Sequence, residues 1–217
     1  MAQRSTRGSG FCRYAVLICL LFSTGLLGVA TLVYPGGSLS DANSEGFDWG
    51  TNFFSNLFND QALNGMYNTS RPWALAGMVF HSLAYGLFFF HAAQKLPSRH
   101  AATVLRVIGV VYVFVHFGIA TPLHDAMVTL SSTVAMLGLF YLTVFIFRTR
   151  LHRLKVFCLL CMLTFYATLF LYGMGNWGLL AVMQKASFIG SMALVLWIEY
   201  FTRTSDFVRV EKMAVSK

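Results

Sequence analysis

The chain has 217 residues, of which 57% are hydrophobic and only 11% are charged, and its mean hydropathy is +0.63. This composition is too apolar for a soluble domain and predicts an integral membrane protein. The formal net charge of +8 is expected to set the orientation in the membrane and to contact membrane lipids that are anionic, and we expect no binding to nucleic acid.

Six stretches of the chain are long and apolar enough for membrane-spanning helices, which need about 20 residues. They lack the short alternation that is typical of barrel strands, and helices satisfy the backbone hydrogen bonds within lipid. The expected spans are residues 14–34, 73–93, 101–120, 126–147, 156–175 and 179–201. The sequence therefore predicts an all-α fold: a polytopic bundle of six transmembrane helices that forms one domain over residues 1–217.

The first stretch has a second interpretation. Arg4, Arg7 and Arg13 precede the apolar run, which ends in the small residues Gly28-Val29-Ala30, and this order also occurs in cleaved signal peptides. The run is long for a signal peptide, and cleavage would leave five helices. We expect a retained spanning helix, with cleavage as the open alternative.

Basic residues indicate which side of the membrane each loop faces, because loops rich in Lys and Arg stay in the cytoplasm. With both termini cytoplasmic, only Arg71 and Lys185 among the 16 basic residues fall on the outer side. The stretch between Arg13 and Arg71 contains no basic residue, so the loop 35–72 is expected outside. Short loops without expected disulfides are typical of a bacterial inner membrane protein.

The outer loop 35–72 holds a cluster of short polar side chains. It begins with Pro35-Gly36-Gly37, which end the first helix, and a short amphipathic helix is predicted over 47–60. Its polar stripe comprises Asp48, Asn52, Ser55, Asn56 and Asn59, and its apolar stripe Phe53, Phe54, Leu57 and Phe58. Two interpretations remain open: an interfacial anchor with the polar stripe in water, or a segment whose polar stripe lines a pocket.

Other polar residues near the outer helix ends are candidates to complete such a pocket. Ionisable groups at membrane depth usually face the bundle interior, and we expect Lys185 to pair with Asp125. Each residue also has a purely structural alternative. Lys185 would extend to water, Asp125 would complement a helix dipole, and each histidine would be a hydrogen-bonded packing residue. The predicted ligand-binding set is Asp48, Asn52, Ser55, His81, Asp125 and Lys185.

Two features toward the cytoplasmic ends of the predicted helices are expected to be structural. Arg106 and Glu199 either pair or extend separately toward water. Cys158 and Cys161 form a C-x-x-C within a predicted span, where packing is the expected role and a disulfide is not.

Four short motifs resemble a bacterial family of six-helix membrane proteins, the domain of unknown function family nine-nine-eight or a close neighbour. The motifs are Tyr34-Pro35-Gly36-Gly37, Asn52-Phe53-Phe54-Ser55-Asn56-Leu57, Thr121-Pro122-Leu123-His124-Asp125 and Gln184-Lys185-Ala186-Ser187. In proteins of this kind the second motif often reads Asn-Phe-x-Ser-Asp-Leu, so Asn56 lacks the carboxylate and a catalytic acid is not expected there. The resemblance covers most of the chain and implies no established activity.

A more distant likeness is to the membrane hydrolase superfamily of alkaline ceramidases and progestin-type receptors. It would imply a zinc site formed from Ser55, His81, His116, His124 and Asp125. That superfamily has seven helices and an H-x-x-x-H in the last one, whereas no histidine follows His152 here. We therefore predict no metal, with His81, His116 and His124 as the residues that a metal would use.

Three functions follow from this outer pocket. The first is binding of a lipid headgroup or another small polar ligand without chemistry. The second is a lipid-modifying hydrolase that depends on a metal such as zinc or on acid/base chemistry. Its base would be His124 or Asp125, Ser55 would be the nucleophile or would orient a zinc-bound water, and Lys185 is a further catalytic candidate. The third, a transporter or channel subunit, lacks a pair of broken or charged helices. The sequence leaves the cofactor, the substrate and the oligomeric state unspecified.

Overall fold

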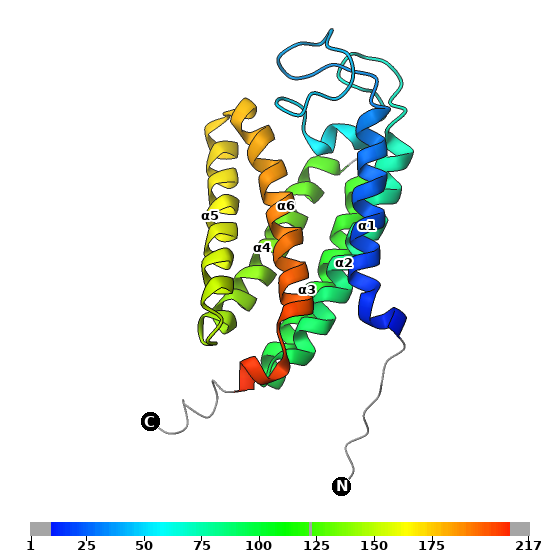
Figure 1. The fold of residues 1–217 in the computed structure, drawn as a ribbon. Helices are drawn as coiled ribbons and strands as arrows, with labels where there is room; N and C mark the ends of the chain where they lie inside the picture. Colours follow the sequence, from blue (N-terminus) through cyan, green and yellow to red (C-terminus); the bar gives the residue numbers. More distant parts are fainter. Residues whose placement is uncertain (1–9, 122, 209–217) are drawn as a thin grey trace.

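The computed structural model describes the backbone of residues 10–121 and 123–208 and, within these ranges, all side chains except those of 10–13, 120, 124 and 125. Six long helices make up most of it (Figure 1). They are α1 (Gly10–Leu32), α2 (Arg71–Lys95), α3 (Arg99–Phe117), α4 (His124–Phe147), α5 (His152–Met174) and α6 (Trp177–Phe201). Two short 3-10 helices, η1 (Phe54–Phe58) and η2 (Gly118–Ala120), lie in the connections.

Each of the six long helices is long and apolar enough to cross a membrane, which confirms the predicted all-α bundle. The helix ends follow local signals. Pro72 in the first turn lets α2 begin at Arg71. Gly175 ends α5 with a φ of +67°, and the Asn176 side chain accepts a hydrogen bond from the backbone N–H of Leu179 at 3.3 Å to start α6.

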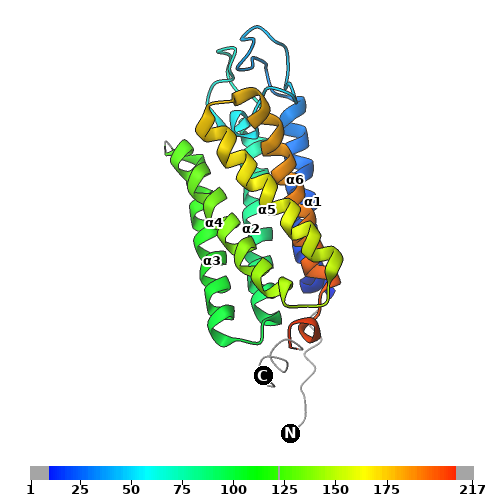
Figure 2. The same ribbon diagram turned by 90° about the vertical axis from the view of Figure 1, so that its left-hand side faces the viewer.

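The helices pack in chain order, each against the next, and α6 also contacts α1 and α2 to close the bundle (Figures 1 and 2). Helix α2 is the most buried of the six. Its side chains Tyr85, Phe88 and Phe89 are fully buried and pack with Leu105 of α3 and Leu139 of α4. The core therefore runs along α2, while much of the apolar surface of the other helices faces outward.

Close contacts between helices depend on glycine. A Cβ atom at Gly109 of α3 would lie 3.0 Å from the Cβ of Phe89, and one at Gly138 of α4 would lie 2.5 Å from the Cζ of the same ring. Both glycines thus make room for Phe89, which fills the space between α2, α3 and α4.

At the end of the bundle where the termini lie, polar contacts join α2 to α6. His91 Nδ1 lies 2.7 Å from Glu199 Oε1, and Lys95 Nζ donates to the carbonyls of Ile198 and Glu199 at 2.7 Å each. The suggested pair of Arg106 with Glu199 is wrong, because Arg106 is exposed and His91 takes the carboxylate. Cys158 and Cys161 are free and buried, as predicted for packing residues.

Candidate functional site

The loop of residues 33–70 covers the opposite end of the bundle (Figure 1) and is called the cap below. The helix predicted over 47–60 is present only as η1 (Phe54–Phe58). Side chains explain the difference, since Asn52 Oδ1 accepts from Asp48 N at 2.8 Å and Asn56 Oδ1 accepts from Phe53 N at 2.7 Å. Such local bonds to the backbone compete with a continuous helix.

Asparagines hold the cap together. Asn52 is fully buried, and its Nδ2 donates to the carbonyl of Gly37 at 2.8 Å. The equally buried Asn68 donates through Nδ2 to three carbonyls, those of Asn56, Leu57 and Asn59, at 3.1, 3.3 and 2.9 Å. The predicted polar stripe is therefore largely an internal hydrogen-bond network, and Asn52 and Asn56 are structural residues of the cap.

Lys185 of α6 attaches the cap to the bundle. Its side chain is buried, with 7% exposed, and Nζ donates to the carbonyls of Asn52 at 2.5 Å and Ala181 at 2.9 Å. The rings of Phe47 and Phe54 lie 5.7 and 5.8 Å from the ammonium, within cation–π range. Lys185 thus bonds to the cap instead of extending to water. The side chain of its predicted partner, Asp125, lies outside the described residues.

Asp48 lies on the exposed surface of the cap. Its carboxylate accepts from the Thr51 hydroxyl at 2.7 Å and from the Gly50 N–H at 2.7 Å. These hydrogen bonds, Thr51 foremost, lower the pKa of the Asp48 carboxyl, and the charge of Lys185 adds to the effect. Asp48 therefore fixes a surface turn.

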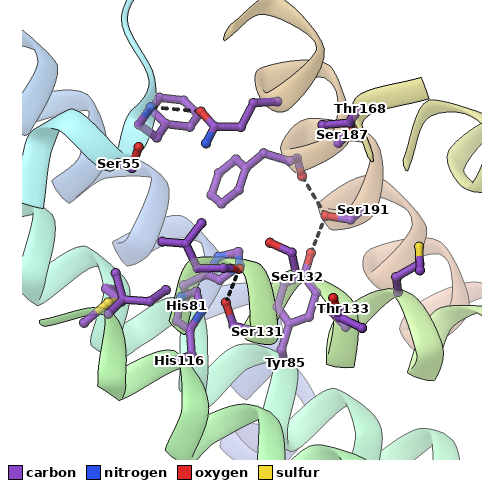
Figure 3. Close-up of a pocket in the computed structure, with 18 of the residues that line it drawn as sticks. Ser55, His81, Tyr85, His116, Ser131, Ser132, Thr133, Thr168, Ser187 and Ser191 are labelled. Carbon is purple, nitrogen blue, oxygen red and sulfur yellow. Dashed lines mark hydrogen bonds between the residues drawn. The ribbon is translucent and has the colours of Figure 1, made fainter. Parts of the chain in front are cut away.

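A cavity of about 200 Å³ lies beneath η1. All six long helices contribute to its lining, α1 through Leu27, and Phe54, Ser55 and Phe58 of η1 lie on the side toward the cap. Its lining is mainly apolar, and much of it consists of aromatic rings. Of the predicted site residues, Ser55, His81 and His116 line this cavity, as Figure 3 shows. Asp48, Asn52 and Lys185 are not part of its lining.

Four aromatic rings on α2 and α3 form a closed group on one wall of the cavity. Ring centroids are 4.5 Å apart for His81 and Tyr85, 5.3 Å for Tyr85 and Tyr112, 5.0 Å for Tyr112 and His116, and 5.4 Å for the two histidines. The two helices are antiparallel neighbours, so a His-x-x-x-Tyr on α2 faces a Tyr-x-x-x-His on α3. The ring of Phe188 on α6 stacks on His81 at 4.8 Å.

The two histidines carry unpaired polar atoms. His81 is only 4% exposed and His116 is largely buried. The Nδ1 atom of each is enclosed and has no hydrogen-bond partner among the described residues. Buried polar atoms nearly always have hydrogen-bond partners, so two imidazoles without such partners beside one cavity are unusual.

Most hydroxyls around the cavity already have partners. Tyr85 Oη lies 2.6 Å from Ser191 Oγ, which in turn donates to the carbonyl of Phe188 at 2.9 Å. The hydroxyls of Thr168 and Ser187 lie 2.9 Å apart, as residues that link α5 to α6. These contacts hold the wall together. The lining groups that make no hydrogen bond in the described part of the chain are the two histidines and the hydroxyls of Ser55, Tyr112 and Ser132.

Sequence reasoning found His81 and His116 but missed Tyr112 and the α4 residues Ser131 and Ser132, which also line the cavity. The mirrored spacing of His and Tyr on α2 and α3 was a usable signal for Tyr112. The side chains of His124 and Asp125, predicted as catalytic or ligand-binding, lie outside the described residues. Within the described part of the chain, no three His, Cys, Asp or Glu side chains lie close enough to hold a metal ion.

Comparison with known proteins found no match to this chain. No family model matches the chain, and neither a curated protein nor a solved structure matches it.

Proposed function

We propose that this chain is a multi-pass membrane protein that binds a lipid-like molecule in the cavity beneath the cap. The observation that carries the proposal is a mainly apolar cavity next to two imidazoles without hydrogen-bond partners. An apolar lining suits the tail or ring of a membrane-soluble molecule, and a few unpaired polar groups suit the one hydrogen-bonding group that orients it.

Hydrolysis fits the same residues less well. A serine nucleophile needs a base within hydrogen-bond reach. The side chains of the predicted bases, His124 and Asp125, lie outside the described residues, and among the described contacts Ser55 makes no hydrogen bond to His81 or His116. A catalytic zinc needs three protein ligands, and no such group is present in the described part. Binding requires only the cavity and the unpaired imidazoles, so it is the simpler function.

The proposal includes an orientation with the cap outside the cell membrane of a bacterium and both termini in the cytoplasm. It is supported by basic residues at the end where the termini lie, such as Lys95, Arg99 and Arg148, against Arg71 and Lys185 at the cap end. A membrane-impermeant maleimide is expected to label Asn43→Cys in intact cells and to label Ser205→Cys only after lysis. The reverse pattern would overturn the orientation.

Ligand binding is tested by extracting the protein directly from membranes into nanodiscs and measuring the bound lipids by mass spectrometry. We expect one lipid species to be enriched over the bulk membrane in the wild-type protein. Ala135→Phe, which places a ring in the cavity from α4, is expected to abolish that enrichment. Ala193→Phe is the matched control, because Ala193 is exposed on α6 and lies outside the cavity lining.

Equal lipid composition in the wild-type protein, Ala135→Phe and the bulk membrane would exclude the proposed function. If Ala135→Phe fails to fold, Ser131→Leu and Ser132→Leu, which line the same cavity from α4, take its place with the same expectation.

A further inference from the structure

We infer that the group held beside His81 and His116 is uncharged and presents a carbonyl oxygen to both imidazoles. This inference rests on the proposed function, which it deepens by naming the chemical class of the ligand: a neutral, carbonyl-bearing lipid. Three observations support it: the charge of the lining, the state of the imidazoles and the engagement of the neighbouring hydroxyls.

The described part of the cavity lining carries no full charge. None of the described residues that line it is Asp, Glu, Lys or Arg. Lys185 follows the lining residue Gln184 in the chain, but its ammonium is turned to the carbonyls of Asn52 and Ala181. A phosphate or carboxylate in the cavity would therefore be buried without a counter-charge from the described lining, which is strongly unfavourable. An uncharged head avoids that cost.

The imidazoles are suited to donate hydrogen bonds into the cavity. No described lining residue is acidic, so none of them favours the imidazolium form, and a neutral imidazole has one N–H. Nδ1 is enclosed and unpartnered in both His81 and His116, and neither ring makes a hydrogen bond through Nε2 among the contacts of the described residues. An unpartnered buried N–H is less common than an unpartnered acceptor, so we assign the proton to Nε2 in both rings. Each ring thus offers an Nε2–H donor to a ligand.

A carbonyl oxygen suits these two donors. It has two lone pairs and brings no donor of its own, so one oxygen accepts from both rings, whose centroids are 5.4 Å apart. A hydroxyl head would add a donor that itself needs an acceptor. Nearby, the oxygens of Tyr85 and Ser191 are already bonded to each other, and those of Thr168 and Ser187 likewise, so the described lining offers such a donor only the hydroxyls of Ser55, Tyr112 and Ser132.

Membranes supply such a carbonyl from two sources: the ring of a quinone and the ester of an acylglycerol. Each source has a matched probe without the carbonyl. A short-chain ubiquinone is compared with its quinol, and dioctanoylglycerol with the ether dioctylglycerol. Dioctanoyl phosphatidic acid adds a phosphate to the same glyceride and tests whether a negative charge on the ligand weakens binding.

The experiment measures dissociation constants of these five probes for the full chain in nanodiscs. We expect one of the two carbonyl probes to bind about tenfold tighter than its carbonyl-free match, the size of one or two lost hydrogen bonds. Phosphatidic acid is expected to bind at least about tenfold more weakly than dioctanoylglycerol. His81→Phe and His116→Phe are each expected to weaken the carbonyl probe three- to tenfold and to leave its match unchanged.

Control variants distinguish a failure of this inference from a failure of the proposed function. His100→Phe alters an exposed histidine at the start of α3 and is expected to change nothing. His81→Gln keeps a donor and is expected to lose less affinity than His81→Phe. Tighter binding of phosphatidic acid, or equal binding within both matched pairs, overturns the inference. If the nanodisc extraction then still finds a lipid that Ala135→Phe removes, the proposed function stands without it.

Discussion

The buried asparagines of the cap and the histidines of the cavity lie on either side of η1, and both groups are shielded from solvent. In the cap, Asn52 and Asn68 use their amides to bond several backbone atoms. In the cavity, the Nδ1 atoms of His81 and His116 meet no partner in the described part of the chain. The difference teaches that a cluster of polar residues in the sequence can be a closed structural network, whereas buried rings without hydrogen-bond partners are the groups on which the proposed function depends.

The largest effect is expected from breaking the cap network. Asn68→Ala removes the donor from three carbonyls, two of them in η1, and is expected to lower the free energy of unfolding by about 3 kcal/mol. Reversible unfolding in mixed micelles measures it. Asn43→Ala, at an exposed position of the cap, serves as control, and an equal loss in both variants would contradict the assigned role of Asn68.

A smaller loss of stability is expected where Lys185 attaches the cap to the bundle. Lys185→Met keeps the apolar stem but removes the ammonium from the carbonyls of Asn52 and Ala181, at an expected cost of about 2 kcal/mol. Limited proteolysis should cut the cap faster in this variant than in the wild-type protein. Lys155→Met, at the other end of the bundle, should leave the cutting rate unchanged.

Replacing a cavity histidine is expected not to lower the free energy of unfolding. His81→Phe keeps a ring between Tyr85 and Phe188 and removes nitrogen atoms that have no partner. The free energy of unfolding is expected to stay unchanged or to rise by up to about 1 kcal/mol. The same unfolding assay measures it. A loss above about 1 kcal/mol would place His81 with the structural residues of the cap and would remove the contrast between the two regions.

The smallest effect concerns the surface of the cap at low pH. Hydrogen bonds from Thr51 and Gly50 lower the pKa of Asp48 in the folded protein, so its contribution is present above the ordinary aspartate pKa near 4 and is lost as the pH falls through the lower folded value. Between pH 6 and pH 3 the wild-type unfolding midpoint should fall slightly more than that of Asp48→Asn. A larger fall in Asp48→Asn would contradict this assignment.

Hydropathy was sufficient to predict the six helices, because the bilayer fixes their length and apolar character. It could not tell which face of a helix meets lipid and which meets protein, since both are apolar, so Tyr112 and Ser131 were missed. The predicted helix over 47–60 depended on periodicity alone. There the side chains of Asn52 and Asn56 bond to the backbone in ways that periodicity does not register.

The bond between Lys185 and the cap also affects how the protein is made. The cap lies between the first two helices, so its whole sequence is synthesised before α3 begins, yet Nζ of Lys185 and Oε1 of Gln184 belong to the last helix. Helices enter the membrane in the order of synthesis. The hydrogen bonds from the cap to Lys185 and Gln184 can therefore form only after α6 has been made, and their presence reports that all six long helices of the described chain have been synthesised.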